Sequence, residues 1–304
     1  MKDYLLFSGS SNQTLAKKVA EELHITLGKV DLSRFADGEV RPWIQEDVRD
    51  KTVFVLQSLS TPMDEYIMEM SLMGDALRRS APKTMVAVIP YLGYSRQDKQ
   101  HRVGEPISSR VIAKFIEISK FKEVIVVDLH NDAIVGFFQI PVTHISAMPV
   151  LVNAIKKLHV TDPVVVSPDV GGVRRARNFA YQLDADLVVM EKKRFIDRHD
   201  VSENFQIIGD VKGRTVIIND DMISTGGTII HSADALRQAG ATSVIVCATH
   251  AVLAGDAKTN LEKAAIDHLI LTDTIIDSED RLPKGTTIVS VASTIATAVL
   301  TIIR

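Results

Sequence analysis

Residues 216–228, VIINDDMISTGGT, combine carboxylates, hydroxyls and glycines that could bind a phosphorylated sugar. Gly226 and Gly227 have no Cβ, which lets the chain turn tightly and brings backbone N–H groups close to phosphate oxygens. Hydroxyl donors surround the glycines, at Ser224, Thr225 and Thr228. The carboxylates of Asp220 and Asp221 suit vicinal hydroxyls or a hydrated magnesium ion better than a phosphate. A phosphate at one end and a diol at the other describe a pentose phosphate.

The pattern around this segment predicts the elements that would position it. The apolar run at 216–218 predicts a short buried strand. Apolar residues then recur at helical spacing and predict a helix, at Ile229, Ala233 and Leu236. Residues 224–228 would form the loop at the helix N-terminus, where backbone N–H groups favour an anion. The lysine of a nucleoside-triphosphate loop and the three-glycine dinucleotide fingerprint are absent. An ordinary strand, turn and capped helix is the alternative, which the two adjacent acids disfavour.

Two further predicted strands also end in polar residues. Asp128 and His130 follow the run at 124–127. Asp169 follows the run at 163–166. Open α/β sheets bind their ligands at the carboxyl ends of the strands, so these residues are candidates for a metal or phosphate site. A histidine at such a position can equally be a structural residue.

The stretch at 167–177, SPDVGGVRRAR, repeats the order of acid, paired glycines and predicted helix. The helix carries three arginines, at Arg174, Arg175 and Arg177. A second anion site is one interpretation. A solvated helix face is the alternative for at least two of the three arginines.

Three more segments could contribute to binding a polyphosphate or a base. Residues 90–99, PYLGYSRQDK, end a strand with Arg96, which can neutralise phosphate, and Gln97, which can bond a base edge. Residues 34–40, RFADGEV, predict a hairpin turn from their Asp-Gly pair. Residues 191–200, EKKRFIDRHD, form a basic cluster that could close over a polyphosphate if the segment is mobile. An ordinary polar loop is the alternative for the first and third segments, and the hairpin turn is itself the alternative for the second.

Short apolar runs alternate with amphipathic patterns along the chain. The runs lie at 4–7, 52–56, 85–89, 124–127, 163–166, 187–190, 216–218 and 243–247. Helical patterns separate most of them, as at 63–77 and 111–118. This alternation predicts an α/β fold of mostly parallel sheets covered on both faces by helices. The length, and the segment 141–149 between two comparable sets of βα units, predict two similar domains at 1–145 and 146–304.

The composition restricts the class of protein. A net charge of −3 over 304 residues provides no broad cationic surface, which disfavours nucleic acid as a partner. Cys247 is the only cysteine, which excludes an internal disulfide and a cysteine-built zinc site. No apolar run reaches the roughly 18 residues that span a bilayer, and no signal-peptide core follows the N-terminus. We therefore expect a cytoplasmic protein with no membrane partner.

Six segments together resemble ribose-phosphate diphosphokinase, also called phosphoribosyl pyrophosphate synthetase, of the main bacterial and eukaryotic class. They occur in the family's order and approximate spacing over nearly the whole chain, as FADGE, PYLGYSRQD, DLHNDAIVGFF with IPVTHISAMP, SPDVGG, the KKR cluster and DDMISTGGT. The resemblance implies two domains of phosphoribosyltransferase type. It also implies magnesium-dependent transfer of the diphosphoryl group of ATP to the 1-hydroxyl of ribose 5-phosphate, with release of AMP. The implied assembly is a homohexamer built from dimers.

The resemblance implies a role for each residue of these motifs. Ribose 5-phosphate would be bound by Asp220, Asp221, Ser224, Thr225, Gly226, Gly227 and Thr228. ATP would be bound by Phe35, Asp37 and Glu39, characteristically from a neighbouring subunit, and by Arg96, Gln97 and Asp98. Magnesium and the diphosphate would lie at His130, Asp169 and Asp128. The catalytic residues of a flexible loop would be Lys192 and Arg194.

The chain departs from the family's usual sequence in two places. The family's pentose loop usually has an acid where this chain has Ser224. Residues 99–105, KQHRVGE, contain fewer arginines than is usual in the family, and this region bears on regulation by phosphate or ADP.

Two other functions are alternatives. A purine or pyrimidine phosphoribosyltransferase would share the pentose-phosphate loop, but it would not need the FADGE, RQD or DLH segments. A non-catalytic regulatory homologue would have no chemical need for Lys192, Arg194 and His130.

Overall fold

The chain divides into two compact units. The computed structural model describes residues 3–194, 203–275 and 279–304, and of residues 192–194, 203–205 and 279 it describes the backbone alone. The first unit comprises Met1–Ala147, Asp273–Asp277 and Ser290–Arg304. The second comprises Met148–Thr272 and Ser278–Val289.

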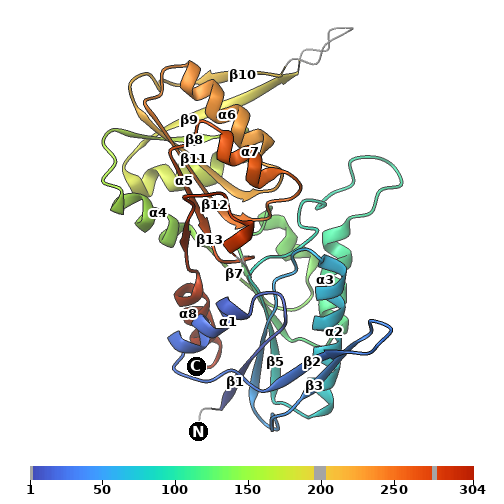
Figure 1. Ribbon diagram of the computed structural model, residues 1–304. Helices are drawn as coiled ribbons and strands as arrows, with labels where there is room; N and C mark the ends of the chain where they lie inside the picture. The colour runs from blue at the N-terminus through green and yellow to red at the C-terminus, as the bar shows by residue number, and fades with distance from the viewer. Residues whose placement is uncertain (1–2, 195–202, 276–278) are drawn as a thin grey trace. The chain divides into compact units, whose positions relative to one another are not determined.

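A parallel sheet with helices on both faces forms the first unit (Figure 1). Its strands follow the order β1-β4-β5-β6-β7, with bounds Tyr4–Ser8, Thr52–Leu56, Thr84–Ile89, Glu123–Val127 and Val142–Ile145. Helices α1 (Gln13–Glu22) and α8 (Ala292–Ile302) pack together on one face. Helices α2 (Met63–Arg79) and α3 (Ser108–Ile118) cover the other face, and the short helix η1 (Asp132–Phe137) follows β6. The predicted hairpin is β2 (Val30–Arg34) and β3 (Val40–Ile44).

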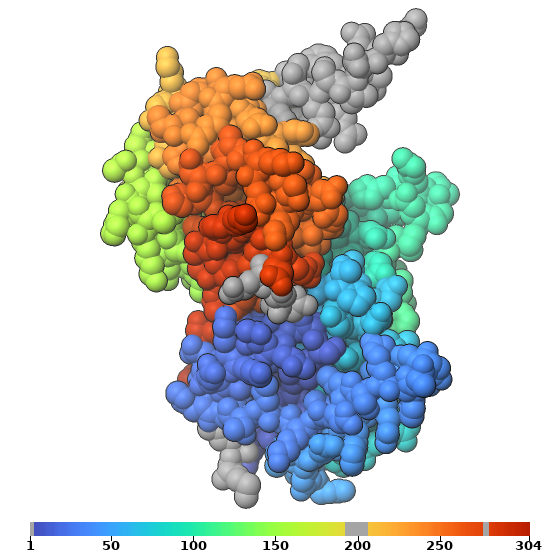
Figure 2. Space-filling view, viewed as in Figure 1, coloured from blue at the N-terminus to red at the C-terminus, as the bar shows by residue number. Residues whose placement is uncertain are grey.

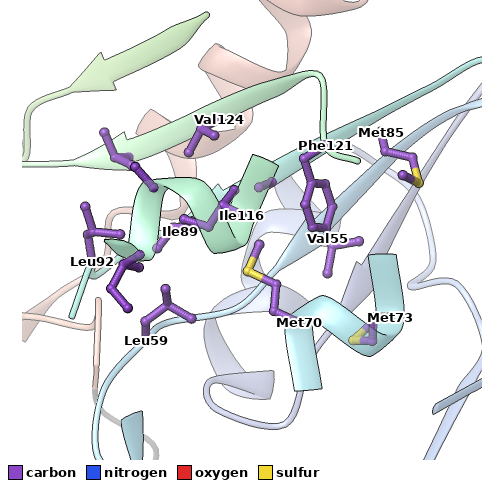
Figure 3. Close-up of a cluster of buried hydrophobic side chains, with 14 of the residues drawn as sticks. Val55, Leu59, Met70, Met73, Met85, Ile89, Leu92, Ile116, Phe121 and Val124 are labelled. Atoms are coloured by element: carbon purple, nitrogen blue, oxygen red, sulfur yellow. The ribbon is translucent and has the colours of Figure 1, made fainter. Parts of the chain in front are cut away.

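The core of the first unit lies between its sheet and the helices α2 and α3. Figure 3 shows Met70 and Met73 of α2 facing Phe121, which precedes β6, and Val55 of β4. All four side chains are buried. Because helices cover both faces of the sheet, successive residues of a central strand are buried, which explains the unbroken apolar runs of the sequence.

The second unit is a seven-stranded sheet in the order β10-β9-β8-β11-β12-β13-β14, in which only β10 is antiparallel to its neighbour. The strand bounds are β8 Pro163–Ser167, β9 Asp186–Arg194, β10 Glu203–Ile208, β11 Thr215–Ile223, β12 Ser243–Ala251, β13 His268–Thr272 and β14 Thr287–Val289. Helices α4 (Met148–Lys157) and α5 (Val173–Leu183) pack on one face. Helices α6 (Gly227–Gln238) and α7 (Ala257–Lys263) lie on the other, and η2 (Glu279–Arg281) precedes β14 (Figure 1). The predicted α/β architecture is therefore confirmed in both units.

Strand β11 is longer than its apolar run, and this extension carries the two acids. Its partner β8 pairs with it only as far as Ile218, opposite Val166. On the other side β12 continues to pair as far as Ile223. The prediction that the strand ends at 218 is corrected, because one neighbour is enough to continue a strand. Asp220 and Asp221 thus lie in a half-paired stretch, beside the point where β8 has ended.

The C-terminal segment belongs to the first unit, whereas the sequence assigned it to a second domain running from 146 to 304. Asp273 is buried, and its carboxylate accepts hydrogen bonds of 2.9 Å from Lys18 Nζ and from the backbone N–H of Val291, just before α8. Asn12 at the start of α1 donates to the carbonyl of Asp273 at 2.7 Å. An apolar C-terminal helix finds its partner by packing, not by sequence order, so periodicity could not assign it.

The described residues contain no helix long and apolar enough to cross a membrane.

Two segments project from the body of the first unit, the β2–β3 hairpin and the loop between β5 and α3 (Figures 1 and 2). The tip of the hairpin carries Phe35, Asp37 and Glu39, and the loop carries Arg96 and Gln97, all of them exposed. The start of the same loop is buried, and Leu92 belongs to the core of the unit.

Candidate functional site

Arg175 of α5 holds the two adjacent acids of β11. Its Nη1 lies 3.1 Å from Asp220 Oδ1 and 3.0 Å from Asp221 Oδ1. Asp220 Oδ1 also accepts a hydrogen bond of 2.8 Å from the backbone N–H of Asp221. The arginine therefore fixes one oxygen of each acid.

The ionisation of Asp220 differs from that of an ordinary carboxyl. Burial, and after it the negative charge of Asp221, raises the pKa of Asp220 to about 8, while the Arg175 guanidinium acts in the opposite direction. Because the two acids interact, the proton belongs to the pair and not to one residue. Such a pair can donate one hydrogen bond and accept others, which matches the two hydroxyls of a sugar diol.

The loop between β11 and α6 leaves several backbone N–H groups without hydrogen bonds among the described residues. Gly226 is the N-cap of α6 with φ +80°, and a Cβ there would lie 3.3 Å from Leu261 Cγ. Gly227 has no positive φ, and a Cβ there would have only Thr225 Oγ1 within 4 Å, at 3.9 Å. Among the described residues, the N–H groups of 225–228 have no hydrogen-bond partner. The carbonyl of Ser224 accepts a 3.0 Å bond from the N–H of Ala254, which fixes the start of the loop. Free donors at a helix N-terminus favour a phosphate, as the sequence predicts.

Asp169 lies in a second tight turn of the same unit, before α5. Its Oδ1 accepts a hydrogen bond of 2.7 Å from the N–H of Gly172, and its carbonyl accepts one of 2.7 Å from Ser167 Oγ. A Cβ at Gly172 would lie 3.0 Å from Ser167 Oγ, so the glycine permits this turn. The side chain of Asp169 is exposed, and no described residue donates to its Oδ2. One oxygen therefore holds the turn and the other is open to a cation.

In the first unit, the loop after β6 carries Asp128 and His130. Asp128 Oδ1 accepts a 2.8 Å bond from Ser146 Oγ, and its Oδ2 accepts a 3.0 Å bond from the N–H of Ala147. The N–H of Leu129 donates to His144 Nε2 at 3.0 Å. His130, between these anchored residues and η1, is exposed. Asp128 thus joins the ends of β6 and β7, while His130 faces solvent.

The Arg96–Asp98 loop is fixed at both Gln97 and Asp98. Ser108 Oγ donates to Gln97 Oε1 at 2.6 Å, and the backbone N–H of Ser109 donates to the Gln97 carbonyl at 3.2 Å. Asp98 Oδ2 accepts a 2.6 Å bond from Asn131 Nδ2, in the loop of His130. Arg96 is exposed. The predicted contact of Gln97 with a base edge competes with its bond to Ser108, whereas Arg96 is available to a phosphate.

Phe35, Asp37 and Glu39 lie at the tip of the β2–β3 hairpin and are all exposed. The N–H of Phe35 donates to the Glu39 carbonyl at 2.9 Å, and Asp37 Oδ1 accepts a 3.2 Å bond from the N–H of Glu39. Arg41 lies over the Phe35 ring, with its guanidinium carbon 5.6 Å from the ring centroid. An aromatic ring that projects into solvent offers a face on which a purine base can stack.

Lys192 and Arg194 lie in β9, paired with Phe205 and Glu203 of β10, but their side chains are outside the described residues. Within the described residues, no three His, Cys, Asp or Glu side chains group closely enough to hold a metal ion. His130 and Asp128 belong to the first unit, and Asp169 belongs to the second.

Sequence reasoning did not predict the contacts of three residues at these sites. Arg175 was one of three arginines on a predicted helix, and only the register between α5 and β11 selects it. His144 lies within a quoted motif, but no pattern links it to Leu129. Asn131 is of a residue type that often caps a helix, and its side-chain oxygen caps η1. Its bond to Asp98, 33 residues earlier in the chain, has no sequence signal.

Comparison with protein families identifies two matching regions. Residues 4–119 match the family described as the N-terminal domain of ribose phosphate pyrophosphokinase. Residues 147–278 match the phosphoribosyl transferase domain family.

Individual relatives are similar over the whole length of the chain. Ribose-phosphate pyrophosphokinase 1 of Streptococcus pneumoniae serotype 4 is 42% identical, over 99% of this chain and 94% of the relative. The protein of the same name from Streptococcus pyogenes serotype M1 is 43% identical over the same shares. The crystal structure of phosphoribosylpyrophosphate synthetase from Mycobacterium smegmatis has a TM-score of 0.93 and 38% identity, covering 99% of both chains.

Proposed function

The chain belongs to the ribose-phosphate pyrophosphokinase family, and from this premise we propose how its residues divide the reaction between them. It is an enzyme that transfers a diphosphoryl group. The proposed substrates are ATP and ribose 5-phosphate, and the products are phosphoribosyl pyrophosphate and AMP. A phosphoribosyltransferase would not account for the match of residues 4–119 to the N-terminal pyrophosphokinase domain.

Ribose 5-phosphate is proposed to bind along β11 and the start of α6. The observation that carries this proposal is the continuous series of Arg175-bridged acids followed by unpartnered N–H groups at 225–228. Asp220 and Asp221 would bond the ring hydroxyls, and the N–H groups would hold the 5-phosphate. Ser224 lies within this series. It offers a hydroxyl at a position where the family's pentose loop usually has an acid.

ATP is proposed to bind the exposed side chains of the first unit. Phe35 would stack on the adenine, with Asp37 and Glu39 beside it, and Arg96 would neutralise the phosphates. The bonds that Gln97 and Asp98 already make suit them to holding this loop in place. His130 would contact the phosphates from the adjacent loop.

Magnesium is the proposed cofactor, and Asp169 fits it best. Magnesium takes oxygen ligands and usually keeps several waters, and Asp169 offers one exposed carboxylate oxygen without a partner among the described residues. Both oxygens of Asp128 already accept hydrogen bonds, so we assign this residue to holding its loop. Bound magnesium would neutralise negative charge on the phosphates.

The reaction itself needs positioning and positive charge more than acid–base chemistry. The 1-hydroxyl oxygen bonds to the β-phosphorus of ATP as the bond to the oxygen of the α-phosphate breaks, and AMP leaves with that oxygen. The proton of the 1-hydroxyl group is released to water. Lys192 and Arg194 are proposed to stabilise the charge that develops on the phosphoryl oxygens. Lys192→Ala is therefore expected to lower kcat by at least a hundredfold, and an unchanged kcat would contradict this assignment.

The test of the proposed function is product identification by chromatography. Purified protein with ATP and magnesium should form AMP and phosphoribosyl pyrophosphate only when ribose 5-phosphate is added. Formation of ADP in place of AMP would overturn the proposal. Consumption of phosphoribosyl pyrophosphate that depends on a purine or pyrimidine base would instead indicate a phosphoribosyltransferase. We also propose a homohexamer built from dimers and a cytoplasmic location, both on the basis of the family.

A further inference from the structure

Asn131 joins two loops of the first unit that carry proposed ATP-binding residues. Its Nδ2 donates to Asp98 Oδ2 at 2.6 Å, and its Oδ1 accepts a 3.0 Å hydrogen bond from the N–H of Ala133. The second bond caps the N-terminus of η1, which immediately follows Asn131. One amide therefore bonds its own loop through the oxygen and the Arg96–Asp98 loop through the nitrogen.

The two loops are already anchored on their other sides. Gln97 is bonded to Ser108 and Ser109 at the start of α3. On the other loop, the N–H of Leu129 donates to His144 in β7. The Asn131–Asp98 bond connects the two loops to each other, two residues after Arg96 and one residue after His130. It therefore sets the distance between the loop of the arginine and the loop of the histidine.

We propose that Asn131 is a positioning residue for ATP, which keeps Arg96 and His130 in a fixed arrangement before the nucleotide binds. This inference rests on the function proposed above for the same loops. The chemistry requires an amide, because the side chain has to donate to one group and accept from another. An ionised aspartate would supply acceptors only, and it would face the carboxylate of Asp98. An alanine would supply neither bond.

The decisive variant is Asn131→Asp, because it keeps the oxygen that caps η1 and replaces only the donor. Preorganised loops contribute equally to the bound nucleotide and to the transition state, so their loss raises KM and spares kcat. We expect the KM for ATP to rise about tenfold, with kcat and the KM for ribose 5-phosphate within about twofold of wild type. Asn131→Ala should raise the KM for ATP to a smaller extent, because it adds no repulsion to the lost bond.

A matched control makes the same chemical change elsewhere. Asn153 is exposed on α4 of the second unit, so Asn153→Asp adds one negative charge without touching either loop. Its KM for ATP should equal that of wild type. If Asn131→Asp instead lowers the thermal midpoint and changes the KM of both substrates together, its role is structural and the proposal is wrong.

The reversed pair gives the most specific readout. In the double variant D98N/N131D the amide and the carboxylate exchange places, so the bond between the loops can form again with its direction reversed. The KM for ATP of the double variant should be several-fold below the product of the two single effects. Effects that simply multiply would show that the two residues are not coupled, and would overturn the proposal.

The outcomes separate this inference from the function on which it rests. If the wild-type protein forms no phosphoribosyl pyrophosphate, the proposed function fails and the positioning role fails with it. If the wild-type protein is active and N131D matches it in the KM for ATP, only the positioning role of Asn131 fails.

Discussion

At the scale of single residues, the two acids of β11 show how burial and charge set the properties of a binding group. Asp220 and Asp221 are adjacent, largely buried and share a single arginine. Burial and mutual repulsion favour a proton on the pair, whereas Arg175 favours its loss. The balance between these effects decides how many hydrogen bonds the pair can donate to a sugar.

Replacing Arg175 should weaken the binding of ribose 5-phosphate. Arg175→Ala removes the cation that holds both carboxylates, so we expect the KM for ribose 5-phosphate to rise by ten- to a hundredfold, with a smaller change in the KM for ATP. Initial-rate kinetics with each substrate varied in turn measure this. Arg177→Ala is the matched control, since Arg177 is exposed on the same helix and should behave as wild type. Equal effects of the two variants would contradict the role given to Arg175.

The raised pKa of Asp220 predicts how stability depends on pH. Between 3.8 and about 8 the folded protein binds more protons at this site than the unfolded chain does. The free energy of unfolding that this site contributes therefore falls as pH rises through that window. Urea denaturation of wild type and Asp220→Asn at several pH values measures the difference. The variant should gain stability relative to wild type as the pH rises, and a difference independent of pH would show that the pKa is not raised.

At the scale of elements, the two glycines of the loop between β11 and α6 are proposed to have different roles. One is needed for the conformation of the loop, and the other for the approach of the ligand. Gly226 has a positive φ and a close neighbour in α7, whereas Gly227 has neither. Both lie in the segment with free N–H groups, where an added Cβ would meet an approaching phosphate.

The two alanine variants should therefore differ in stability but not in their effect on the substrate. Gly226→Ala should lower the free energy of unfolding by about 1–3 kcal/mol because of its strained φ. Gly227→Ala should leave it unchanged or raise it slightly. Both should raise the KM for ribose 5-phosphate. Denaturation curves and kinetics on the same preparations test this, and a stable Gly227→Ala protein with unchanged KM would exclude that glycine from the phosphate site.

At the scale of the whole molecule, the proposed homohexamer predicts that one protomer completes the site of another. The resemblance to the family implies that Phe35 of one subunit would lie at the ATP site of its neighbour. Phe35 lies on a projecting hairpin and His130 on the loop after β6. If each site takes Phe35 and His130 from different protomers, two inactive variants can together form intact sites.

Subunit mixing tests this directly. Phe35→Ala and His130→Ala should each lose most activity. Co-expressed in equal amounts, they should recover about a quarter of the wild-type activity, since a quarter of the sites then combine an intact Phe35 with an intact His130. No recovery in mixed oligomers would show that both residues act within one protomer. Sedimentation equilibrium should give a mass of six times the 33.4 kDa chain.

The sequence by itself determined the α/β architecture, the loop that precedes α6 and the family. Apolar runs, helical spacing and the glycines of the loops are local features, and local features are encoded in consecutive residues. The hairpin at 34–40 and the start of α6 could be predicted for the same reason. The six motifs indicated the reaction because they occur together in the order that is typical of the family.

Only the tertiary structure decided which side chains meet. Arg175 was selected from three arginines by the register between α5 and β11, and Asn131 was joined to Asp98 across 33 residues. Strand β11 continued past its apolar run because β12 pairs with it further than β8 does. The C-terminal helix joined the first unit through α1 and Asp273. These contacts depend on packing between distant segments, and the pattern of neighbouring residues carries no signal for them.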